Sequence, residues 1–376
     1  MSDFLQRLGI LFIFSALLIA CDSTEEPSVS FPTAFDLEAE VPFYFGSNFE
    51  IPEDNPMTVE GIALGRMLFY EKKLSGDNSM SCGTCHQQSK AFTDGERFSK
   101  GIDGSLGRFN AMSLTNLLWN QKFFWNGRST SLEEQALIPI EDPIEMHQSL
   151  DAAVAKLQNT PEYPEMFKKA FGDEIITAEN IGKAIAQFER TLISSNSKYD
   201  QFLKGEYTPT ALEQRGIDLF FTHPIAQAGL RGGNCGDCHT NVLTSGDLNG
   251  FNGFHNNGLD EDATLRDGLK TVTGKDADKG KFKAPTLRNI ALTAPYMHDG
   301  RFNTLEEVLE HYDQHIRTSN TLDPLIIEAS NEIRSPGDPV KLFLTPDEKE
   351  AIIAFMNMLT DEEFITNPKF SDPFKN

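Results

Sequence analysis

The chain has 376 residues, more than one hydrophobic core usually organises, so its length favours two domains. Its 33 Lys and Arg stand against 56 Asp and Glu, and the formal net charge of −23 argues against a nucleic-acid partner, whose phosphates need a basic face. Either a solvated acidic surface or a field that steers a basic partner, such as a small electron-carrier protein, explains this charge.

The beginning of the chain predicts export. An apolar run, Leu8–Ala20, follows Arg7 and is too short for a comfortable membrane span, so residues 1–20 are predicted to be a signal peptide. The run ends in Leu-Ile-Ala before Cys21, which resembles the lipobox of bacterial lipoproteins; an ordinary signal peptide with an incidental cysteine is the alternative. We expect residues 21–49 to be a lipidated N-terminus and a tether on the periplasmic side, with this lipid as the sole membrane contact.

Two copies of the pattern Cys-x-x-Cys-His account for the other four cysteines. In this pattern two thioethers fix the edge of a haem, and the next residue places its imidazole under the iron. Zinc ribbons bring their cysteine pairs within roughly 15–20 residues, far closer than here. Thioredoxin-like pairs neither require the His nor usually occur twice. The sequence therefore predicts two covalently bound haem c groups, at Cys82, Cys85 and His86 and at Cys235, Cys238 and His239.

Helical periodicity dominates the rest of the chain and predicts a mainly α fold. Few segments alternate as strands do, and the stretch 245–280, rich in Gly, Asn and Asp, is typical of a long loop. The predicted helical segments are Val59–Tyr70, Leu150–Phe171 with a break near Pro161 and Pro164, Ala178–Ile193, Thr210–Phe221, Leu305–Ile316 and Pro346–Leu359.

The two halves of the chain repeat one pattern. Segments that begin at Ala111 and Trp125 match segments that begin at Ala284 and His298, and both pairs have the same offset. The offset between the haem motifs is smaller, so the second half carries an insertion, which belongs to the predicted long loop.

Each half therefore contains a helix, a haem motif and a further helix. The further helix opens with an N-cap, Ser131 or Thr304, two residues before Glu-Glu. We expect two tandem cytochrome c-like domains, each with one covalent haem: an N-terminal haem domain at residues 50–205 and a C-terminal one at 206–366.

Three stretches carry a family resemblance: Phe124–Gln135, Pro139–Met146 and Phe282–Gly300. With them, the chain from about Ile51 to Leu359 resembles the bacterial dihaem cytochrome c peroxidases. That family includes MauG, which matures a tryptophan-derived quinone cofactor in a partner protein.

The resemblance implies roles for residues around the first haem, the family's peroxide site. Gln135 and Glu145 occupy the positions that assist O–O cleavage, where a carboxyl group can carry a proton between the two oxygens. Trp125 matches the tryptophan that relays electrons between the haems. The structural alternatives are a charge near a helix N-terminus for Glu145, a solvent-facing helical side chain for Gln135 and a core aromatic for Trp125.

The resemblance also implies one calcium ion between the haems. Asn110, Thr293 and Pro295 match its protein ligands, which are one side-chain oxygen and two backbone carbonyls. With so few protein ligands, waters are expected to complete the shell of this hard cation.

Two positions depart from the peroxidase pattern. Ile102 stands where many dihaem peroxidases have a second His that blocks the peroxide site until reduction. Tyr312 stands where a Met ligand is expected; MauG has a tyrosine there, so Tyr312 is the implied ligand of the second iron, with a packed aromatic as the alternative. The competing iron ligands are Met297, His311, Met356 and Met358 for the second haem and His147 for the first.

Three functions follow from these patterns. The first is a peroxidase that reduces hydrogen peroxide to water with electrons from a small c-type cytochrome or cupredoxin. The second is a MauG-like oxidase that uses peroxide to oxidise a protein or another aromatic substrate. The third is a non-catalytic dihaem electron carrier, which the expected open site and the pair Gln135 and Glu145 argue against. The sequence leaves the oligomeric state open, a homodimer included.

Overall fold

A computed structural model describes residues 32–246 and 253–375, and the predicted signal peptide and the lipidation at Cys21 lie outside them. The described chain is mainly helical, and no helix in it is long and apolar enough to cross a membrane. The helices are α1 (Val59–Tyr70), α2 (Cys82–Cys85), α3 (Leu132–Glu141), α4 (Leu150–Gln158), α5 (Glu162–Phe171), α6 (Ala178–Arg190), α7 (Lys198–Leu203), α8 (Ala211–Phe221), α9 (Lys270–Thr273), α10 (Leu305–Gln314), α11 (Pro324–Glu328), α12 (Pro346–Met358) and α13 (Glu362–Thr366). The strands β1 (Phe254–His255) and β2 (Phe282–Lys283) pair antiparallel.

The predicted helices are confirmed, with boundaries that differ by a few residues. The predicted break separates α4 from α5, and Pro161 directly precedes α5. The predicted N-caps Ser131 and Thr304 accept hydrogen bonds from the backbone N–H groups of Glu134 and Glu307. Local sequence signals therefore determine where these helices begin.

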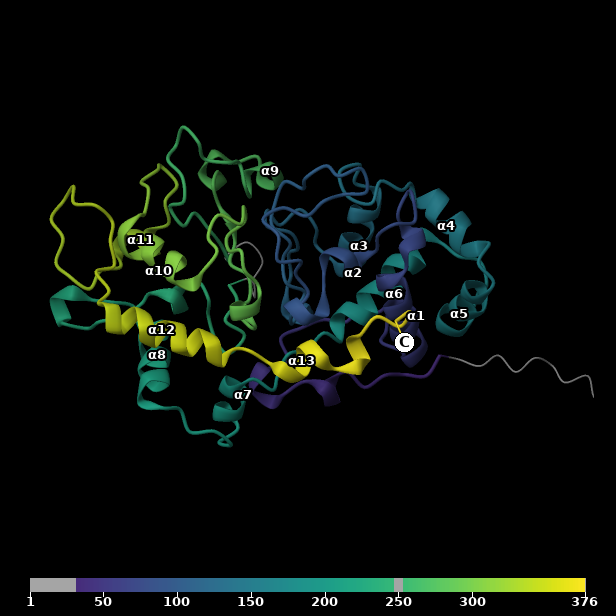
Figure 1. Ribbon diagram of the computed structural model, residues 1–376, viewed down its shortest axis with the longest axis horizontal. Coiled ribbons are helices and arrows are strands. Elements are labelled where there is room, and N and C mark those ends of the chain that lie inside the picture. The colour runs from purple at the N-terminus through teal and green to yellow at the C-terminus, as the bar shows by residue number, and fades with distance from the viewer. Residues whose placement is uncertain (1–31, 247–252, 376) are drawn as a thin grey trace, which may run out of the picture. The chain divides into compact units, whose positions relative to one another are not determined.

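Each half is built on one pair of crossing helices, α1 with α6 and α8 with α12 (Figure 1). A glycine lies at each crossing, where the backbones touch. A Cβ atom on Gly65 would lie 1.9 Å from the carbonyl oxygen of Ala184, and one on Gly216 would lie 1.9 Å from that of Ala351. The duplication seen in the sequence thus extends to the packing of the two halves.

The N-terminal boundary of the folded chain needs correction. The predicted tether extends to residue 49, but Leu37 and Phe45 are buried, and the Phe45 ring packs edge-on against Trp119 with centroids 5.2 Å apart. The backbone N–H of Phe35 also donates to the Met57 carbonyl. The described part of the predicted tether therefore belongs to the folded protein.

The limits of the C-terminal half also differ from 206–366. Helix α7 precedes residue 205, yet its Tyr199 packs on Phe355 of α12 with centroids 5.0 Å apart. Helix α13 returns to the N-terminal half, where Phe364 packs on Phe92 at 5.5 Å (Figure 1). Aromatic contacts between residues distant in the chain set both limits.

Gly65→Ala and Gly216→Ala should each destabilise the haem-loaded protein by about 1–3 kcal/mol, because the added methyl group would overlap a backbone carbonyl whose position is fixed by its helix. Helix propensity alone would stabilise each variant by about 0.8–1.0 kcal/mol, so the sign of the effect separates the two causes. Denaturant unfolding followed by far-ultraviolet circular dichroism measures it. Ala63 is exposed on α1, and Ala63→Gly is the control for propensity. A Gly65→Ala variant more stable than the wild type would contradict the close crossing.

Candidate functional site

The first Cys-x-x-Cys-His motif forms a short helix that ends at an oriented imidazole. Helix α2 carries Cys82 and Cys85, and the next residue, His86, holds its Nδ1 atom 2.8 Å from the Phe92 carbonyl oxygen. Ala91 and Phe92 both have positive φ, a rare backbone conformation that turns this carbonyl toward the ring. With Nδ1–H donating, the Nε2 atom of His86 is left to bind a metal.

The second motif is arranged in the same way. The Nδ1 atom of His239 lies 3.0 Å from the Pro285 carbonyl oxygen and 3.3 Å from that of Thr244. Burial lowers the pKa of His239 to about 4 and also lowers the pKa of His86. Both imidazoles are therefore neutral at pH 7, which is the form that ligates iron.

Two cavities accompany the two motifs, and their walls fit covalently attached haems. The first, of about 500 Å³, is lined by Cys82, Cys85 and His86, and the second, of about 190 Å³, by Cys235, Cys238 and His239. None of these cysteines forms a disulfide. Because the cysteine pairs lie in separate cavities, they cannot ligate one zinc ion together. Each cavity combines two thiols with an imidazole whose Nε2 is available, as haem c requires.

Glu145 lies in the wall of the first cavity with its pKa shifted toward neutrality. Burial raises the pKa of its carboxyl to about 7, and the charge of Asp142 adds to the rise, while the Arg128 guanidinium opposes it. The carboxyl of Glu145 can therefore both accept and donate a proton near pH 7. Its position is held by the Ile102 backbone N–H, which donates to the Glu145 carbonyl at 3.0 Å.

Gln135, on α3, lines the same cavity as Glu145 and His86. Its Oε1 atom is buried and has no hydrogen-bond partner among the described residues. A buried amide oxygen without a partner costs free energy unless a ligand supplies a donor. His147, the competing ligand for the first haem, is exposed and does not line the cavity.

Sequence reasoning missed several charged residues that line this cavity, Arg128 and Glu189 among them. Arg128 places its guanidinium 3.4 Å from the ring centroid of Phe124, and burial lowers the pKa of this arginine. Glu189 lies near the end of α6. Arg128 stands within the stretch that carries the family resemblance, so a signal existed for it. Glu189 had none, because a Glu near the end of an amphipathic helix is expected to face solvent.

Trp125 lines both cavities and so lies between the two motifs. Its indole Nε1–H donates to the Asn110 carbonyl at 2.8 Å, and its ring centroid is 6.5 Å from that of His298. Asn110, Thr293 and Pro295, the predicted calcium ligands, all line the second cavity. The fold therefore brings Asn110, distant in the chain, to the same cavity as Thr293 and Pro295.

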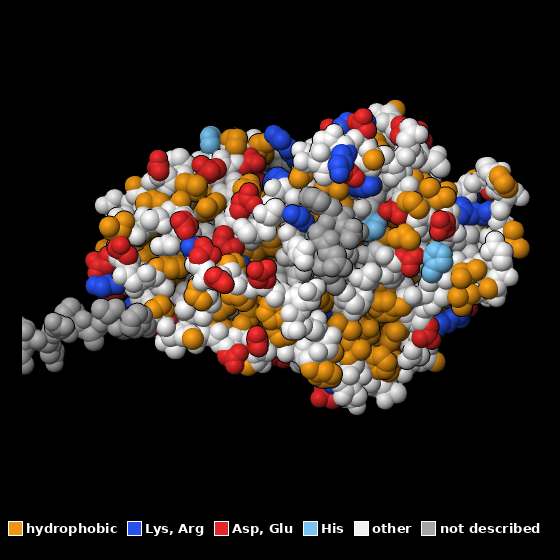
Figure 2. Space-filling view, turned by 180° about the vertical axis from the view of Figure 1, so that it is seen from behind, with side chains coloured by type: hydrophobic (Ala, Val, Ile, Leu, Met, Phe, Trp, Pro, Cys, Tyr) orange, Lys and Arg blue, Asp and Glu red, His pale blue; other side chains and the backbone are white. Residues whose placement is uncertain are grey.

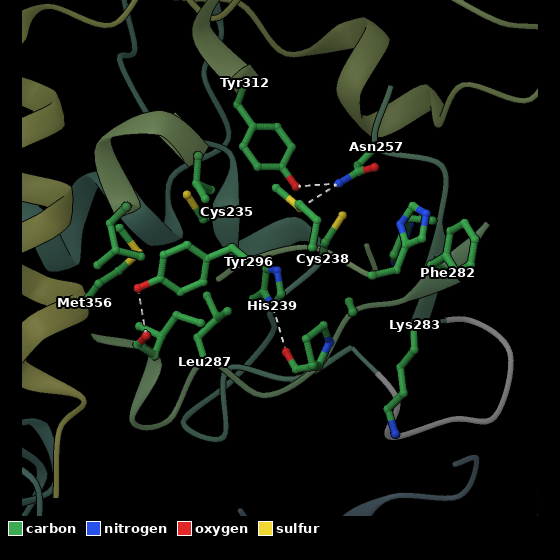
Figure 3. Close-up of a pocket in the computed structure, with 18 of the residues that line it drawn as sticks. Cys235, Cys238, His239, Asn257, Phe282, Lys283, Leu287, Tyr296, Tyr312 and Met356 are labelled. Carbon is green, nitrogen blue, oxygen red and sulfur yellow. Dashed lines mark hydrogen bonds between the residues drawn. The ribbon is translucent and has the colours of Figure 1, made fainter. Parts of the chain in front are cut away.

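Tyr312 points from α10 into the second cavity, and His239 enters it from below (Figure 3). The Asn257 amide donates both to the Tyr312 hydroxyl, at 3.1 Å, and to the Met297 sulfur, at 3.4 Å. Burial raises the pKa of the Tyr312 phenol, and this hydrogen bond opposes the rise. One amide thus holds the two candidate iron ligands, Tyr312 and Met297, side by side.

The other competing ligands differ in whether they line the second cavity. Met356 lines the second cavity, whereas Met358 and His311 do not. The His311 Nε2 atom lies 3.0 Å from the Asn257 carbonyl oxygen, so this ring is already engaged. Of the ligands predicted from the sequence, Tyr312, Met297 and Met356 therefore remain.

Comparisons with known proteins agree with this arrangement. Residues 59–208 match the family model of di-haem cytochrome c peroxidases. The chain is 36% identical to the methylamine utilization protein MauG of Methylorubrum extorquens over 263 residues, 69% of this chain and 70% of that protein. It is 34% identical to the cytochrome c551 peroxidase of Nitrosomonas europaea over 314 residues, 82% of each. The crystal structure of a MauG-like protein associated with microbial copper homeostasis superposes with a TM-score of 0.78 at 38% identity, covering 89% of this chain and 99% of that one.

Proposed function

This chain belongs to the dihaem cytochrome c peroxidase family, which includes MauG, and we propose that it reduces hydrogen peroxide to water with electrons from a small carrier protein. The family consists of dihaem c-type cytochromes, in agreement with the two Cys-x-x-Cys-His motifs. The observation that carries the proposal is the first cavity, where His86, Gln135 and the half-buried Glu145 line one space.

A bound haem would supply the redox-active iron for the chemistry of peroxide. Cys82 and Cys85 would attach it, and the Nε2 atom of His86 would ligate the iron. The Glu145 carboxyl takes a proton from one peroxide oxygen and returns it to the other, which a pKa of about 7 allows in both directions. The unpartnered Oε1 atom of Gln135 accepts a hydrogen bond from the peroxide O–H and orients it.

Trp125 relays electrons between the two haems. Its indole borders both cavities, and the hydrogen bond to the Asn110 carbonyl fixes its orientation. One calcium ion near this wall would be held by the Asn110 side-chain oxygen and the carbonyls of Thr293 and Pro295, with waters completing its shell. Calcium there would keep the wall between the cavities in place.

The electron donor is a small c-type cytochrome or cupredoxin that docks through complementary charge. The excess of 56 acidic over 33 basic residues favours a basic donor. On the face seen in Figure 2, however, the acidic side chains are spread rather than gathered in one patch. The proposal includes export by residues 1–20 and a lipid on Cys21 that holds the enzyme on the periplasmic side of a membrane. It leaves the oligomeric state, a homodimer included, to measurement.

Steady-state turnover of hydrogen peroxide with a reduced c-type cytochrome or a reduced cupredoxin tests the proposed activity. Rapid donor oxidation with two electrons consumed per peroxide is the expected result. Slow donor oxidation combined with peroxide-dependent oxidation of an aromatic substrate would assign the MauG-like reaction instead. Absence of any reaction with peroxide would make the protein an electron carrier.

Glu145→Gln should lower the rate constant for the reaction with peroxide by about 10²- to 10⁴-fold, because the amide cannot carry the proton. Glu145 accepts a proton only when ionised, so the wild-type rate should rise with pH through about 7 and level off above it. The variant should lose this rise and keep both haems. Glu141→Gln, an exposed position on α3, is the matched control. An unchanged peroxide rate in Glu145→Gln would return this residue to a structural role.

A MauG-like oxidase is the second candidate, and Tyr312 favours it. Tyr312 borders the second cavity with its hydroxyl held by Asn257. An anionic tyrosinate stabilises oxidised iron, whereas a Met ligand raises the potential. A Tyr-ligated second haem would therefore be a poorer electron reservoir than a Met-ligated one, and that suits the oxidation of a substrate more than rapid peroxide reduction.

Electron paramagnetic resonance of the resting protein should give one high-spin and one low-spin ferric signal, and Tyr312→Phe should change the low-spin one. The first haem should be high-spin and react with peroxide in the ferric state, because Ile102 replaces the blocking His. Tyr296→Phe is the control, since Tyr296 lines the same cavity but donates to the Ile290 carbonyl. Two low-spin His-ligated signals, or a Met-type near-infrared band that survives Tyr312→Phe, would overturn this ligand assignment.

A further inference from the structure

Glu189 is a buried carboxyl that the proposed peroxide chemistry does not use. It lies near the end of α6 with 3% of its surface exposed, and it lines the first cavity together with Cys82 and Glu145. Its Oε2 atom has no hydrogen-bond partner among the described residues. An acidic side chain in such a place costs free energy, so its presence needs an explanation.

The C-terminal half provides an internal comparison for this position. Phe188 of α6 faces the crossing glycine of α1, and Phe355 of α12 faces the crossing glycine of α8 in the same way. The next residue is Glu189 in α6 and Met356 in α12, and Met356 lines the second cavity with 4% exposure. An apolar side chain therefore satisfies the packing at this point of the fold. The carboxyl is an addition specific to the first haem site.

The surroundings of Glu189 bring the pKa of its carboxyl into the range where a nearby change of charge can alter its protonation. Burial raises the pKa of its carboxyl to about 8; the charge of Arg190 lowers this pKa and that of Glu133 raises it. Arg190 and Glu133 are themselves paired at 2.7 Å, which weakens the net effect of both. Helix α1, on the other side of α6, presents Gly61 and Gly65 at its crossing and no charge there. The C-terminal end of a helix also disfavours a negative charge.

We propose that Glu189 is a redox-linked proton carrier of the first haem, which binds one proton from solvent when that haem accepts one electron and releases it when the haem is reoxidised. The electron comes from the donor protein, and the proton converts the carboxylate to the carboxylic acid. The proposal rests on haem attachment at Cys82 and Cys85. It holds whether the enzyme reduces peroxide or oxidises a substrate.

Charge balance explains why the two events are coupled. One added electron makes the haem site more negative by one unit, and in a poorly solvated cavity that charge disfavours a nearby carboxylate. The pKa of Glu189 is therefore higher in the reduced state than in the oxidised state. Between these two pKa values reduction takes up a proton, so the reduction potential falls as pH rises. Below and above that window the potential does not depend on Glu189.

The test is the reduction potential of the first haem between pH 5 and 10, measured on the protein with both haems and followed at the high-spin absorption. For the wild type we expect a fall between an acidic and an alkaline plateau. If the proton affinity changes by about tenfold, this fall is about 59 mV. Glu189→Gln should lose this fall. Glu189→Met, which copies the C-terminal half, should lose it as well and should not be less stable than the wild type.

Controls distinguish Glu189 from the other acids of the site. Glu145→Gln should keep the part of the fall that Glu189→Gln loses, and the haem propionates contribute equally to all variants. Infrared difference spectra should gain a protonated-carboxyl band on reduction in the wild type and in Glu145→Gln but not in Glu189→Gln. A pH dependence unchanged in both Glu189 variants, or one lost in Glu145→Gln alone, would overturn the proposal. None of these measurements requires peroxide, so failure of the proposed function would not be mistaken for failure of this inference.

Discussion

A buried polar junction joins the two halves, and the walls of both cavities depend on it. Asn116 and Asn289, at matching positions of the duplication, both have positive φ and accept backbone N–H groups, from Ser194 and Asp361 respectively, at 2.8 Å. Their own N–H groups donate to the carbonyls of Leu192 and Leu359, just beyond α6 and α12. The Ser194 hydroxyl donates to the Asp361 carboxylate at 3.0 Å and links the two sets of hydrogen bonds.

All four polar side chains of this junction are buried, so the loss of one partner would leave another unpaired, at a cost of about 1–3 kcal/mol. The segment that begins at Asn116 continues into residues of the first cavity, and the segment that begins at Asn289 continues into residues of the second. The junction therefore couples the positions of the two cavity walls.

The sequence predicted those parts of the fold that depend on local signals. Helices with an apolar stripe and a Ser or Thr cap, such as α3 and α10, begin where the pattern says, because caps and periodicity act within one or two turns. The limits of the two halves were not predictable in this way. Residues 32–49, α7 and α13 contain short apolar groups whose partners lie far away in the chain, as Phe364 does on Phe92. Ser194 is likewise buried, and its hydroxyl joins the junction through a partner far away in the chain, Asp361.

The residues of the candidate site also divide into those that sequence signals predicted and those that depend on tertiary packing. The cysteines and histidines follow from the chemistry of haem attachment, and Gln135 and Glu145 follow from a motif; the structure brings Gln135 and Glu145 to the cavity of Cys82, Cys85 and His86. The sequence could not give the electrostatic state of Glu145, because its pKa depends on burial and on Asp142 and Arg128. Nor could it find Glu189, whose burial becomes visible only when α6 is packed against the cavity.

The two halves share one frame but differ in the polar groups that face their cavities, and this difference carries the chemistry. The first cavity contains two acids able to exchange protons, Glu145 and Glu189, beside the amide of Gln135. At the equivalent place of Glu189 the second cavity has Met356, and it adds Tyr312 held by Asn257. A site that must move protons as well as electrons needs groups with pKa values near the working pH, whereas a site that passes electrons needs a stable ligand set and little else. Duplication thus supplied two cavities of the same construction, and the proposed proton-coupled chemistry of the first one would depend on the few side chains that differ on its inner wall.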